Sequence, residues 1–273
     1  MVAPRLHIMT ATASDYAVIL RRGPTQQVAS IGWHRASDSF ELGQWLHGRI
    51  YEHRADLSPD GRHMIYFAGK GGVREGRAPW WTAISRAPYL HAIAFLPQDS
   101  TWGGGGAFTE QGEVFLNGGG PLPNDADGLV PAANTAMPHS TDGFHMGGLY
   151  AAAMQRRGWQ ADSVPGYGAG LWRELAGGWR IELRFETQAA NRSIVANRYA
   201  LVLPGKARVD HPDWEWADIW QDGLHFAAQG GLHFARIGPD GQLHDHRPIR
   251  NFSDMSFERI RAPYDDRNKG DHR

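Results

Sequence analysis

Cysteine is absent from this chain of 273 residues, and the absence excludes four kinds of site. A disulfide scaffold, a thiolate zinc site, an iron–sulfur cluster and a cysteine nucleophile all need thiols. Lysine is also scarce, because Lys70, Lys206 and Lys269 are the only three. Arginine therefore supplies most of the positive charge, and its planar guanidinium favours two-point pairing with carboxylates.

The chain also lacks a strong net charge and any long apolar run. Its 28 Lys and Arg residues against 29 Asp and Glu give a net charge of −1, so the basic field that nucleic-acid binding relies on is missing. No stretch approaches the roughly 18 consecutive apolar residues of a membrane span. Residues 1–14 are interrupted by Pro4, Arg5 and His7, which argues against a signal peptide. We expect a cytoplasmic protein with no nucleic-acid and no membrane partner.

Glycine and tryptophan, by contrast, are abundant, with 34 Gly and 11 Trp. Short segments of alternating polar and apolar residues recur along the chain and predict strands. These segments are residues 16–22, 27–34, 63–68, 80–86, 91–97, 113–117, 179–185, 194–203 and 224–227. Pro-Asp-Gly turns follow at 59–61 and 239–241. The pattern predicts an all-β, β-propeller-like fold of roughly five or six small antiparallel sheets.

We expect residues 1–264 to form a single propeller-like domain, with a polar tail at 265–273. Residues 118–148 open with three glycines, contain four prolines and show little periodicity, which predicts an irregular insertion. The segment 149–157 is ambiguous, because its helix formers and the following glycine also suit a short helix. Its GLY…GW pattern resembles the GLW…GW pattern at 170–179, so we favour a repeated hairpin there.

Four stretches resemble known families. Residues 56–67, DLSPDGRHMIYF, resemble the blade element of WD40 and TolB-type β-propellers, and residues 214–252 are similar to a whole blade. The resemblance implies a propeller of repeated four-stranded blades. Residues 43–52 and 81–94 also resemble an uncharacterised bacterial family of hypothetical proteins, which implies no activity.

Histidines in the last third of the chain are candidate metal ligands. A three-residue loop at 228–230 predicts that His225 lies opposite His233, and the next turn predicts that His233 lies opposite His246. Imidazoles on neighbouring strands are close enough to share a Zn, Cu, Fe or Ni ion. We prefer the alternative, a blade face that carries histidine as a surface residue, and we predict no metal and no cofactor.

Tryptophan and arginine side chains are the candidate ligand contacts. An exposed Trp on a loop can hold a sugar ring, a base or a peptide anchor. The charged segment 49–56 is expected to be a strand whose arginines pair with Glu52 and Asp56 or hold an anionic ligand, and structural ion pairs are its ordinary explanation. The candidate ligand-binding residues are Trp80, Trp81, Trp102, Arg49, Arg54 and Arg86.

These residues lead us to expect a non-enzymatic binding module that contacts a protein or small-molecule ligand through a loop-bearing face. The alternative is a carbohydrate-active hydrolase or lyase on the same scaffold, with Glu52 and Asp56 or the histidines of the central segment as its reacting groups. Three other motifs point to no such chemistry. Residues 123–128 do not match an EF-hand calcium loop, and an acidic turn is their ordinary explanation. Residues 138–145 lack a nucleophile elbow, which favours a polar loop over a catalytic triad. Residues 69–72 lack the spacing of a phosphate loop.

Overall fold

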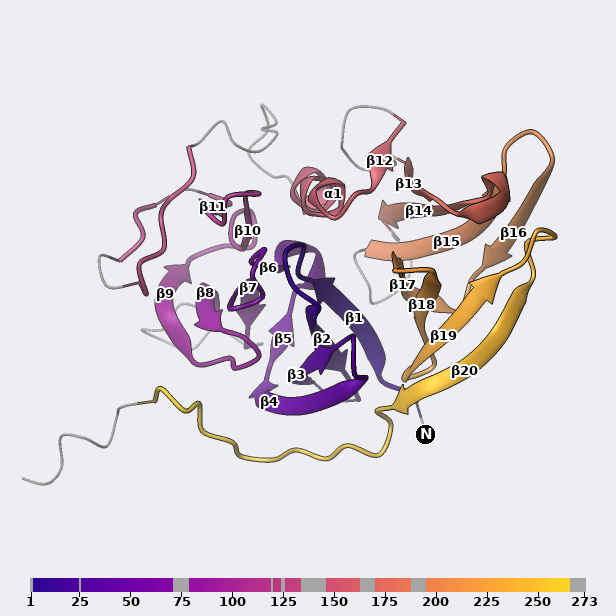
Figure 1. The fold of residues 1–273 in the computed structure, drawn as a ribbon. Helices are drawn as coiled ribbons and strands as arrows, with labels where there is room; N and C mark the ends of the chain where they lie inside the picture. The colour runs from indigo at the N-terminus through magenta and orange to yellow at the C-terminus, as the bar shows by residue number, and fades with distance from the viewer. Residues whose placement is uncertain are drawn as a thin grey trace, which may run out of the picture. The chain divides into compact units, whose positions relative to one another are not determined.

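The computed structural model describes residues 2–24, 26–70, 79–118, 120–123, 126–133, 146–162, 170–187 and 195–265. Over these residues the chain is built almost entirely of antiparallel strands (Figure 1). It separates into two compact units. The first unit contains Met1–Ile8 and Thr135–Met255, and the second unit contains Met9–Asn134 and Ser256–Arg273. The boundary between the units falls within the first strand, β1 (Arg5–Thr10).

Two sheets form most of the second unit. One is a meander in the order β1-β2-β3-β4, and the other has the order β5-β7-β8-β9, with β6 beside β7. A two-stranded ladder, β10-β11, accompanies them. The bounds are β2 (Tyr16–Arg22), β3 (Gln27–His34), β4 (Ser39–His47), β5 (Arg49–Ile50), β6 (Asp56–Leu57), β7 (His63–Gly69), β8 (Trp80–Arg86), β9 (Ala92–Gln98), β10 (Gly106–Phe108) and β11 (Val114–Leu116).

The first unit holds one helix and two further sheets, in the orders β12-β13-β14-β15-β16 and β17-β18-β19-β20. Its elements are α1 (Met146–Arg156), β12 (Gln160–Ala161), β13 (Gly170–Glu174), β14 (Arg180–Thr187), β15 (Val195–Leu203), β16 (Ala207–His211), β17 (Trp214–Trp220), β18 (Gly223–Ala228), β19 (Gly231–Ile237) and β20 (Leu243–Asn251). Every described pairing within these sheets is antiparallel between neighbours in sequence.

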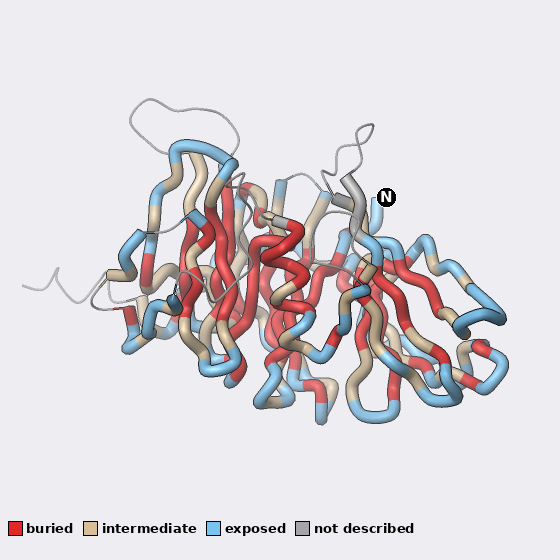
Figure 2. Tube along the Cα trace, turned by 90° about the horizontal axis from the view of Figure 1, so that it is seen from above, coloured by how far each residue is buried: buried red, intermediate tan, exposed pale blue. Residues whose placement is uncertain are grey.

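Each unit has an apolar core that its two large sheets share. In the second unit, Val18 of β2 and Met64 of β7 belong to one buried cluster. In the first unit, Leu183 of β14 and Phe226 of β18 pack in a cluster that also contains Met154 of α1. Burying one such side chain stabilises a fold by about 1.5–3 kcal/mol. Figure 2 shows the buried residues concentrated along the strands and the exposed ones at the turns.

The predicted fold class is confirmed: the chain is all-β, of the β-propeller class, and four of its sheets have the size of a blade. The predicted strands 16–22, 27–34 and 80–86 have the bounds of β2, β3 and β8. The segment 214–252, expected to be a whole blade, contains the four-stranded sheet β17–β20. The expectation of a single domain over residues 1–264 stays a prediction.

The irregular insertion and the polar tail are described only in part. Residues 119, 124–125 and 134–145 of the predicted insertion lie outside the described residues, as do residues 266–273 of the predicted tail. Pro131, in the described part of the insertion, forms a bridge with Val114 of β11. Within the described ranges, no helix combines the length and the apolar character that crossing a membrane requires.

The hairpin predicted for residues 149–157 is wrong, because this segment lies in the helix α1. Leu149, Tyr150, Ala153 and Met154 are each at most 3% exposed. Tyr150, Ala151 and Met154, which are spaced one, three and four residues apart, form the helical face that packs into the first unit's core. Burial of this face, and not the repeated glycine pattern, decides the local structure.

The strand predicted for residues 49–56 is also wrong. The strand β5 ends at Ile50, a 3₁₀ turn occupies Glu52–Arg54, and β6 begins at Asp56. The turn brings the side chain of Arg54 into the protein, where it is 4% exposed. Its Nη1 donates to the carbonyl oxygens of Thr101 and Gly103, both at 2.8 Å. These buried hydrogen bonds accompany the break in the strand.

The predicted alignment of three histidines fails by one residue. The loop between β18 and β19 has two residues, Gln229 and Gly230, both with positive φ, as in the tight hairpin turn of type I′. His225 therefore pairs with Phe234, and His233 pairs with Phe226. Because neighbouring residues of a strand point to opposite faces, His225 and His233 lie on opposite sides of the sheet.

Candidate ligand pocket

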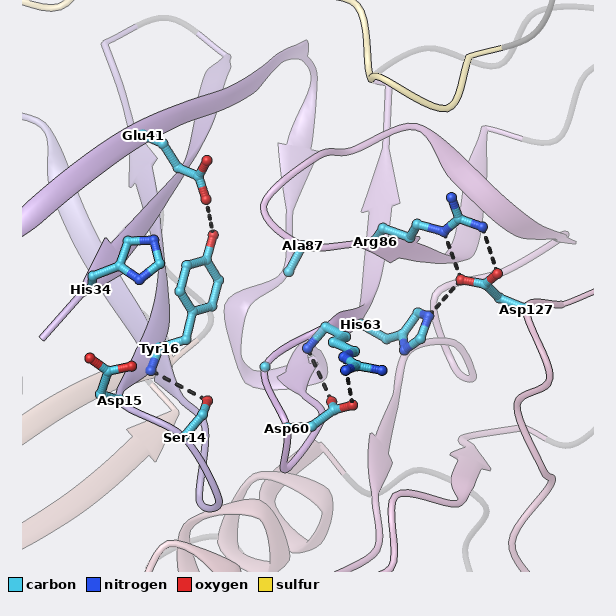
Figure 3. Close-up of a pocket in the computed structure, with 12 residues that line it drawn as sticks. Ser14, Asp15, Tyr16, His34, Glu41, Asp60, His63, Arg86, Ala87 and Asp127 are labelled. Atoms are coloured by element: carbon cyan, nitrogen blue, oxygen red, sulfur yellow. Dashed lines mark hydrogen bonds and ion pairs between the residues drawn. The ribbon is translucent and has the colours of Figure 1, made fainter.

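A pocket of about 630 Å³ lies in the second unit, at strand ends of its two large sheets (Figure 3). Two cross-strand pairs border it. Tyr16 lies opposite His34 at the ends of β2 and β3, and His63 lies opposite Arg86 at the ends of β7 and β8. The lining residues are Ser14, Asp15, Tyr16, His34, Glu41, Asp60, Gly61, Arg62, His63, Arg86, Ala87 and Asp127.

Tyr16 and Glu41 form a hydrogen bond that spans a whole strand. The hydroxyl of Tyr16 on β2 donates to Oε1 of Glu41 on β4 at 2.6 Å, across the intervening strand β3. The strand β3 carries Gly32 at this point. A β-carbon there would stand 2.1 Å from the Tyr16 oxygen and 2.8 Å from Cγ of Glu41. Because Gly32 has no side chain, the phenol of Tyr16 can pass over β3 and reach Glu41.

Tyr16 is held as a neutral phenol. Burial, and then the hydrogen bond to Glu41 and its negative charge, raise the pKa of Tyr16 above its ordinary value. An ionised phenolate would lose its hydrogen bond and repel the carboxylate. The imidazole of His34 packs edge-on against the phenol, with ring centroids 4.9 Å apart. The Tyr16 hydroxyl thus donates its one hydrogen to Glu41, and its oxygen lone pairs can still accept a hydrogen bond from another partner.

The Pro-Asp-Gly turn contributes Asp60 and Gly61 to the lining of the pocket beside Tyr16. Oδ1 of Asp60 accepts hydrogen bonds from the Ser58 hydroxyl at 2.6 Å and from the Arg62 backbone N–H at 3.0 Å. Partial burial acts to raise the pKa of Asp60, but these hydrogen bonds lower it below its ordinary value. Gly61 has a φ of 80°, and a β-carbon on it would stand 3.0 Å from Cβ of Tyr16. A glycine is therefore required where the turn meets Tyr16.

Asp127 is fixed from two sides. Arg86 donates to both of its carboxylate oxygens, from Nε at 2.7 Å and from Nη2 at 2.6 Å. Nε2 of His63 lies 2.8 Å from Oδ2 of Asp127, and the imidazole is the donor because a carboxylate only accepts. The hydrogen bonds from Arg86 and then from His63 hold the pKa of Asp127 well below its usual range.

Figure 3 shows Asp15, Tyr16, His34 and Glu41 on one side and Asp60, His63, Arg86 and Asp127 on the other. The acceptor group comprises Asp15, Tyr16, His34 and Glu41, and the paired group comprises Asp60, Arg62, His63, Arg86 and Asp127. In the paired group, carboxylates meet guanidinium or imidazole groups within 4.0 Å. The arrangement suits reversible binding of a small polar molecule, because its polar side chains are already oriented before a ligand arrives.

Of the six predicted ligand-binding residues, Arg86 alone lines the pocket. Arg54 instead contacts the loop that carries Trp102. The hydrogen bonds from Arg54 to Thr101 and Gly103 flank Trp102 on both sides in sequence, and the Trp102 side chain is 71% exposed. Arg54 is thus a buried support for the loop that presents Trp102.

The other three predicted residues lie elsewhere in the second unit. Trp80 and Trp81 are half-buried on β8, and Trp81 stacks on the exposed Phe95 of β9 with centroids 6.0 Å apart. The guanidinium of Arg49 lies over the ring of Tyr51 at 4.7 Å. The structure therefore does not gather the predicted tryptophans and arginines at one site, and their role as ligand contacts stays a prediction.

The acidic residues of the alternative enzyme are held in structural contacts. Asp56 is fully buried, and its two oxygens accept the backbone N–H groups of Leu57 at 2.9 Å and Phe108 at 2.8 Å. Glu52 forms an ion pair with Arg22 at 2.8 Å. These contacts tie β6 to β10 and the 3₁₀ turn to β2, so neither carboxylate lines the pocket.

The histidines of the first unit form a pair and not a row of three. Nε2 of His246 lies 3.2 Å from Nδ1 of His233, while His225 is buried against Phe234, with ring centroids 5.3 Å apart. Among the residues that the structure describes, no three His, Cys, Asp or Glu side chains converge as metal ligands.

Sequence reasoning missed Tyr16, Glu41, His63 and Asp127 as site residues. Tyr16 and His63 were assigned only as strand residues, and Asp127 only as part of an acidic turn. One signal was available: the Pro-Asp-Gly turn puts Asp60 and Gly61 next to the start of a strand, where propeller loops gather. Nothing local indicated which other segments would meet it.

Comparison with known proteins identifies no family for this chain. No protein-family profile matches the sequence, and no curated protein matches it. Among the solved structures that resemble it are three with 7%, 7% and 10% sequence identity and TM-scores of 0.32, 0.32 and 0.31. They are the uncharacterized protein lmo1340 from Listeria monocytogenes, prolyl oligopeptidase B from Galerina marginata and the GH43 protein BlXynB from Bacillus licheniformis.

The matches cover 89%, 90% and 96% of this chain but span only 66%, 44% and 60% of those proteins. Similarities of this size indicate neither a shared activity nor a shared ligand. The chain is therefore characterised by its own geometry: an all-β protein of the propeller class, with a polar pocket in its second unit.

Proposed function

We propose that this chain is a non-enzymatic binding module that takes a small polar ligand in the pocket bordered by Tyr16, Glu41, Arg86 and Asp127. One observation carries the proposal: polar side chains from six separate segments line one pocket of about 630 Å³, and several hold one another in place. A volume of this size is typical of sites for small molecules. Fixed polar groups bind with little loss of side-chain entropy.

The protonation states support binding more than catalysis. Glycoside cleavage needs a carboxyl group that stays protonated near neutral pH, yet the pKa shifts of Asp60 and Asp127 are both downward. A histidine base for nucleophilic attack needs a hydroxyl partner. The described contacts of His63 and His34 include none between their imidazoles and a serine hydroxyl.

We take this pocket, and not the loop that carries Trp102, as the primary site. Arg86 is the predicted ligand-binding residue that lines it. Trp102 remains an accessible group on a supported loop. We assign it no part in the pocket, since it is not among the lining residues.

A thermal-shift screen against small sugars, polyols, amino sugars, amino acids and phosphate esters tests the proposal. A ligand at 100 times its Kd stabilises the protein by about 2.7 kcal/mol. We expect at least one compound class to raise the Tm of the wild-type chain, and Glu41→Gln to reduce that rise. The matched control is Glu110→Gln, the same change at an exposed turn outside the pocket. A rise that Glu41→Gln leaves intact, or turnover of the compound, contradicts the proposal.

A further inference from the structure

The formal charges lining the pocket are unequal. Four carboxylates, from Asp15, Glu41, Asp60 and Asp127, face the guanidinium groups of Arg62 and Arg86. Arg86 is bound to Asp127 through two hydrogen bonds. Nε of Arg62 lies 3.7 Å from Oδ2 of Asp60. Both arginines are thus matched to a carboxylate within the paired group, and the surplus of negative charge falls on the acceptor group.

In the acceptor group, the carboxylates of Glu41 and Asp15 form no ion pair among the described residues. The nearby guanidinium of Arg35 donates instead to the backbone carbonyl oxygens of Ser14 at 2.8 Å and Asp15 at 3.0 Å. Glu41 accepts one hydrogen bond, from Tyr16, and a carboxylate has room for about four. The Tyr16 hydroxyl has already donated its hydrogen, so it offers only lone pairs. The carboxylates of Glu41 and Asp15 and the phenolic oxygen of Tyr16 therefore present acceptors on this side of the pocket. The Ser14 hydroxyl and the His34 imidazole, which also line it, can both donate and accept.

Aromatic rings accompany these acceptors. His34 packs edge-on against Tyr16, with centroids 4.9 Å apart. Tyrosine faces attract cations, more strongly where water is excluded. An anionic ligand, such as a carboxylate or a phosphate, would meet Glu41 and Asp15 as like charges. The complementary ligand group is a donor with positive charge, which in small metabolites is an ammonium group.

The paired group on the opposite side has a different character. Two carboxylates and two guanidinium groups balance each other in formal charge there. The group presents both carboxylate oxygens, which accept hydrogen bonds, and N–H groups, which donate them. Hydroxyl groups both donate and accept, so they match such a surface.

From these two sides we infer that the ligand is a polyhydroxylated amine, such as an amino sugar, with its ammonium group at Glu41, Asp15 and Tyr16 and its hydroxyls toward Asp60 and Asp127. This inference rests on the proposed function. It names the ligand class of the same pocket.

Three matched pairs of probes test the inference by isothermal titration calorimetry at pH 7: glucosamine and glucose, galactosamine and galactose, mannosamine and mannose. Within at least one pair, we expect the amine to bind at least tenfold more tightly than the neutral sugar. Glu41→Gln keeps the shape of the side chain and should reduce that preference at least threefold, whereas Glu110→Gln should not change it.

Neutral sugars that bind as tightly as their amines would overturn the inference and leave the proposed function standing. Absence of binding by all three amines would also overturn it. The thermal-shift screen then separates the two ideas, because a hit from a neutral or anionic class supports the pocket while excluding the amine, and no hit in any class contradicts both.

Discussion

The phenol of Tyr16 passes over Gly32, so closely that a β-carbon on the glycine would stand 2.1 Å from the phenolic oxygen. Tyr16 and Gly32 lie on neighbouring strands, and the bare backbone between them lets a residue of β2 reach a residue of β4. A polar contact in this pocket therefore depends on a residue that carries no side chain.

The variant Gly32→Ala should destabilise the protein, by about 1–3 kcal/mol, because the added methyl group displaces the phenol. Tyr16→Phe alone should cost about 0.5–1.5 kcal/mol, the usual contribution of one hydrogen bond. In the double variant the phenolic oxygen is gone, so the cost should be smaller than the sum of the two. Urea unfolding of the four proteins measures this, and strictly additive costs would show that the two sites do not meet.

Asp127 should make the free energy of unfolding depend on pH in the acidic range. Its pKa in the folded chain is lowered by Arg86 and His63, so its contribution is full well above the ordinary aspartate pKa of about 3.9. The contribution is lost as pH falls from there toward the lowered folded value.

Asp127→Asn measures this contribution. For a partly exposed ion pair, we expect the free energy of unfolding of wild type to exceed that of the variant by about 0.5–1 kcal/mol at pH 7. Chemical unfolding between pH 7 and pH 2.5 should show the difference shrinking below pH 4. A difference that is constant over this range would mean that the carboxylate charge does not contribute.

Asp56 should behave as a structural residue. It is fully buried and accepts the N–H groups of Leu57 and Phe108, and a buried donor left without a partner costs about 1–3 kcal/mol. Asp56→Ala should therefore cost about 2–4 kcal/mol in unfolding free energy. Asp56→Asn should cost less, because the amide oxygen still accepts one hydrogen bond. If Asp56→Ala leaves stability unchanged, the link between β6 and β10 does not depend on this carboxylate.

Trp102 should be dispensable for folding. Its side chain is 71% exposed, and exposed substitutions usually change stability by no more than about 0.5 kcal/mol. Trp33, which is 0% exposed, offers the matched contrast, since removing a buried Trp costs about 3–5 kcal/mol. Thermal unfolding of Trp102→Ala and Trp33→Ala compares them. Unfolding of Trp102→Ala to the extent of Trp33→Ala would place Trp102 in the core.

Strand positions were predictable wherever one strong pattern decided them. The segments 16–22, 27–34 and 80–86 have β-branched and aromatic residues between turn residues, and their bounds agree with β2, β3 and β8. The helix α1 was not predictable in the same way, because its alanines and glycines are compatible with a helix or a hairpin. Packing of one helical face into the core decides between them. Tertiary burial overrides local propensity there.

The register of β18 and β19 shows a second limit. The glycine at 230 suggested a three-residue loop, but Gln229 also takes a positive φ, of 50°. Such a conformation is uncommon for a residue other than glycine, so the two-residue turn was not expected. One residue of slip sends His225 and His233 to opposite faces.

The pocket itself was beyond sequence reasoning because it joins distant segments. Tyr16, Glu41, His63 and Asp127 come from four parts of the chain, and each looks ordinary in its local setting. Only the pairing of strands brings Tyr16 opposite His34 and His63 opposite Arg86.

The amino sugar that binds most tightly among glucosamine, galactosamine and mannosamine, titrated into the isotope-labelled chain and followed by backbone amide chemical shifts, tests the central claim most directly. Our account predicts that the signals of Tyr16, His34 and Glu41 move with one common Kd, and that at the same concentrations they move less in Glu41→Gln. Shifts centred on the Trp102 loop, or no shifts up to the highest soluble concentration, would contradict it.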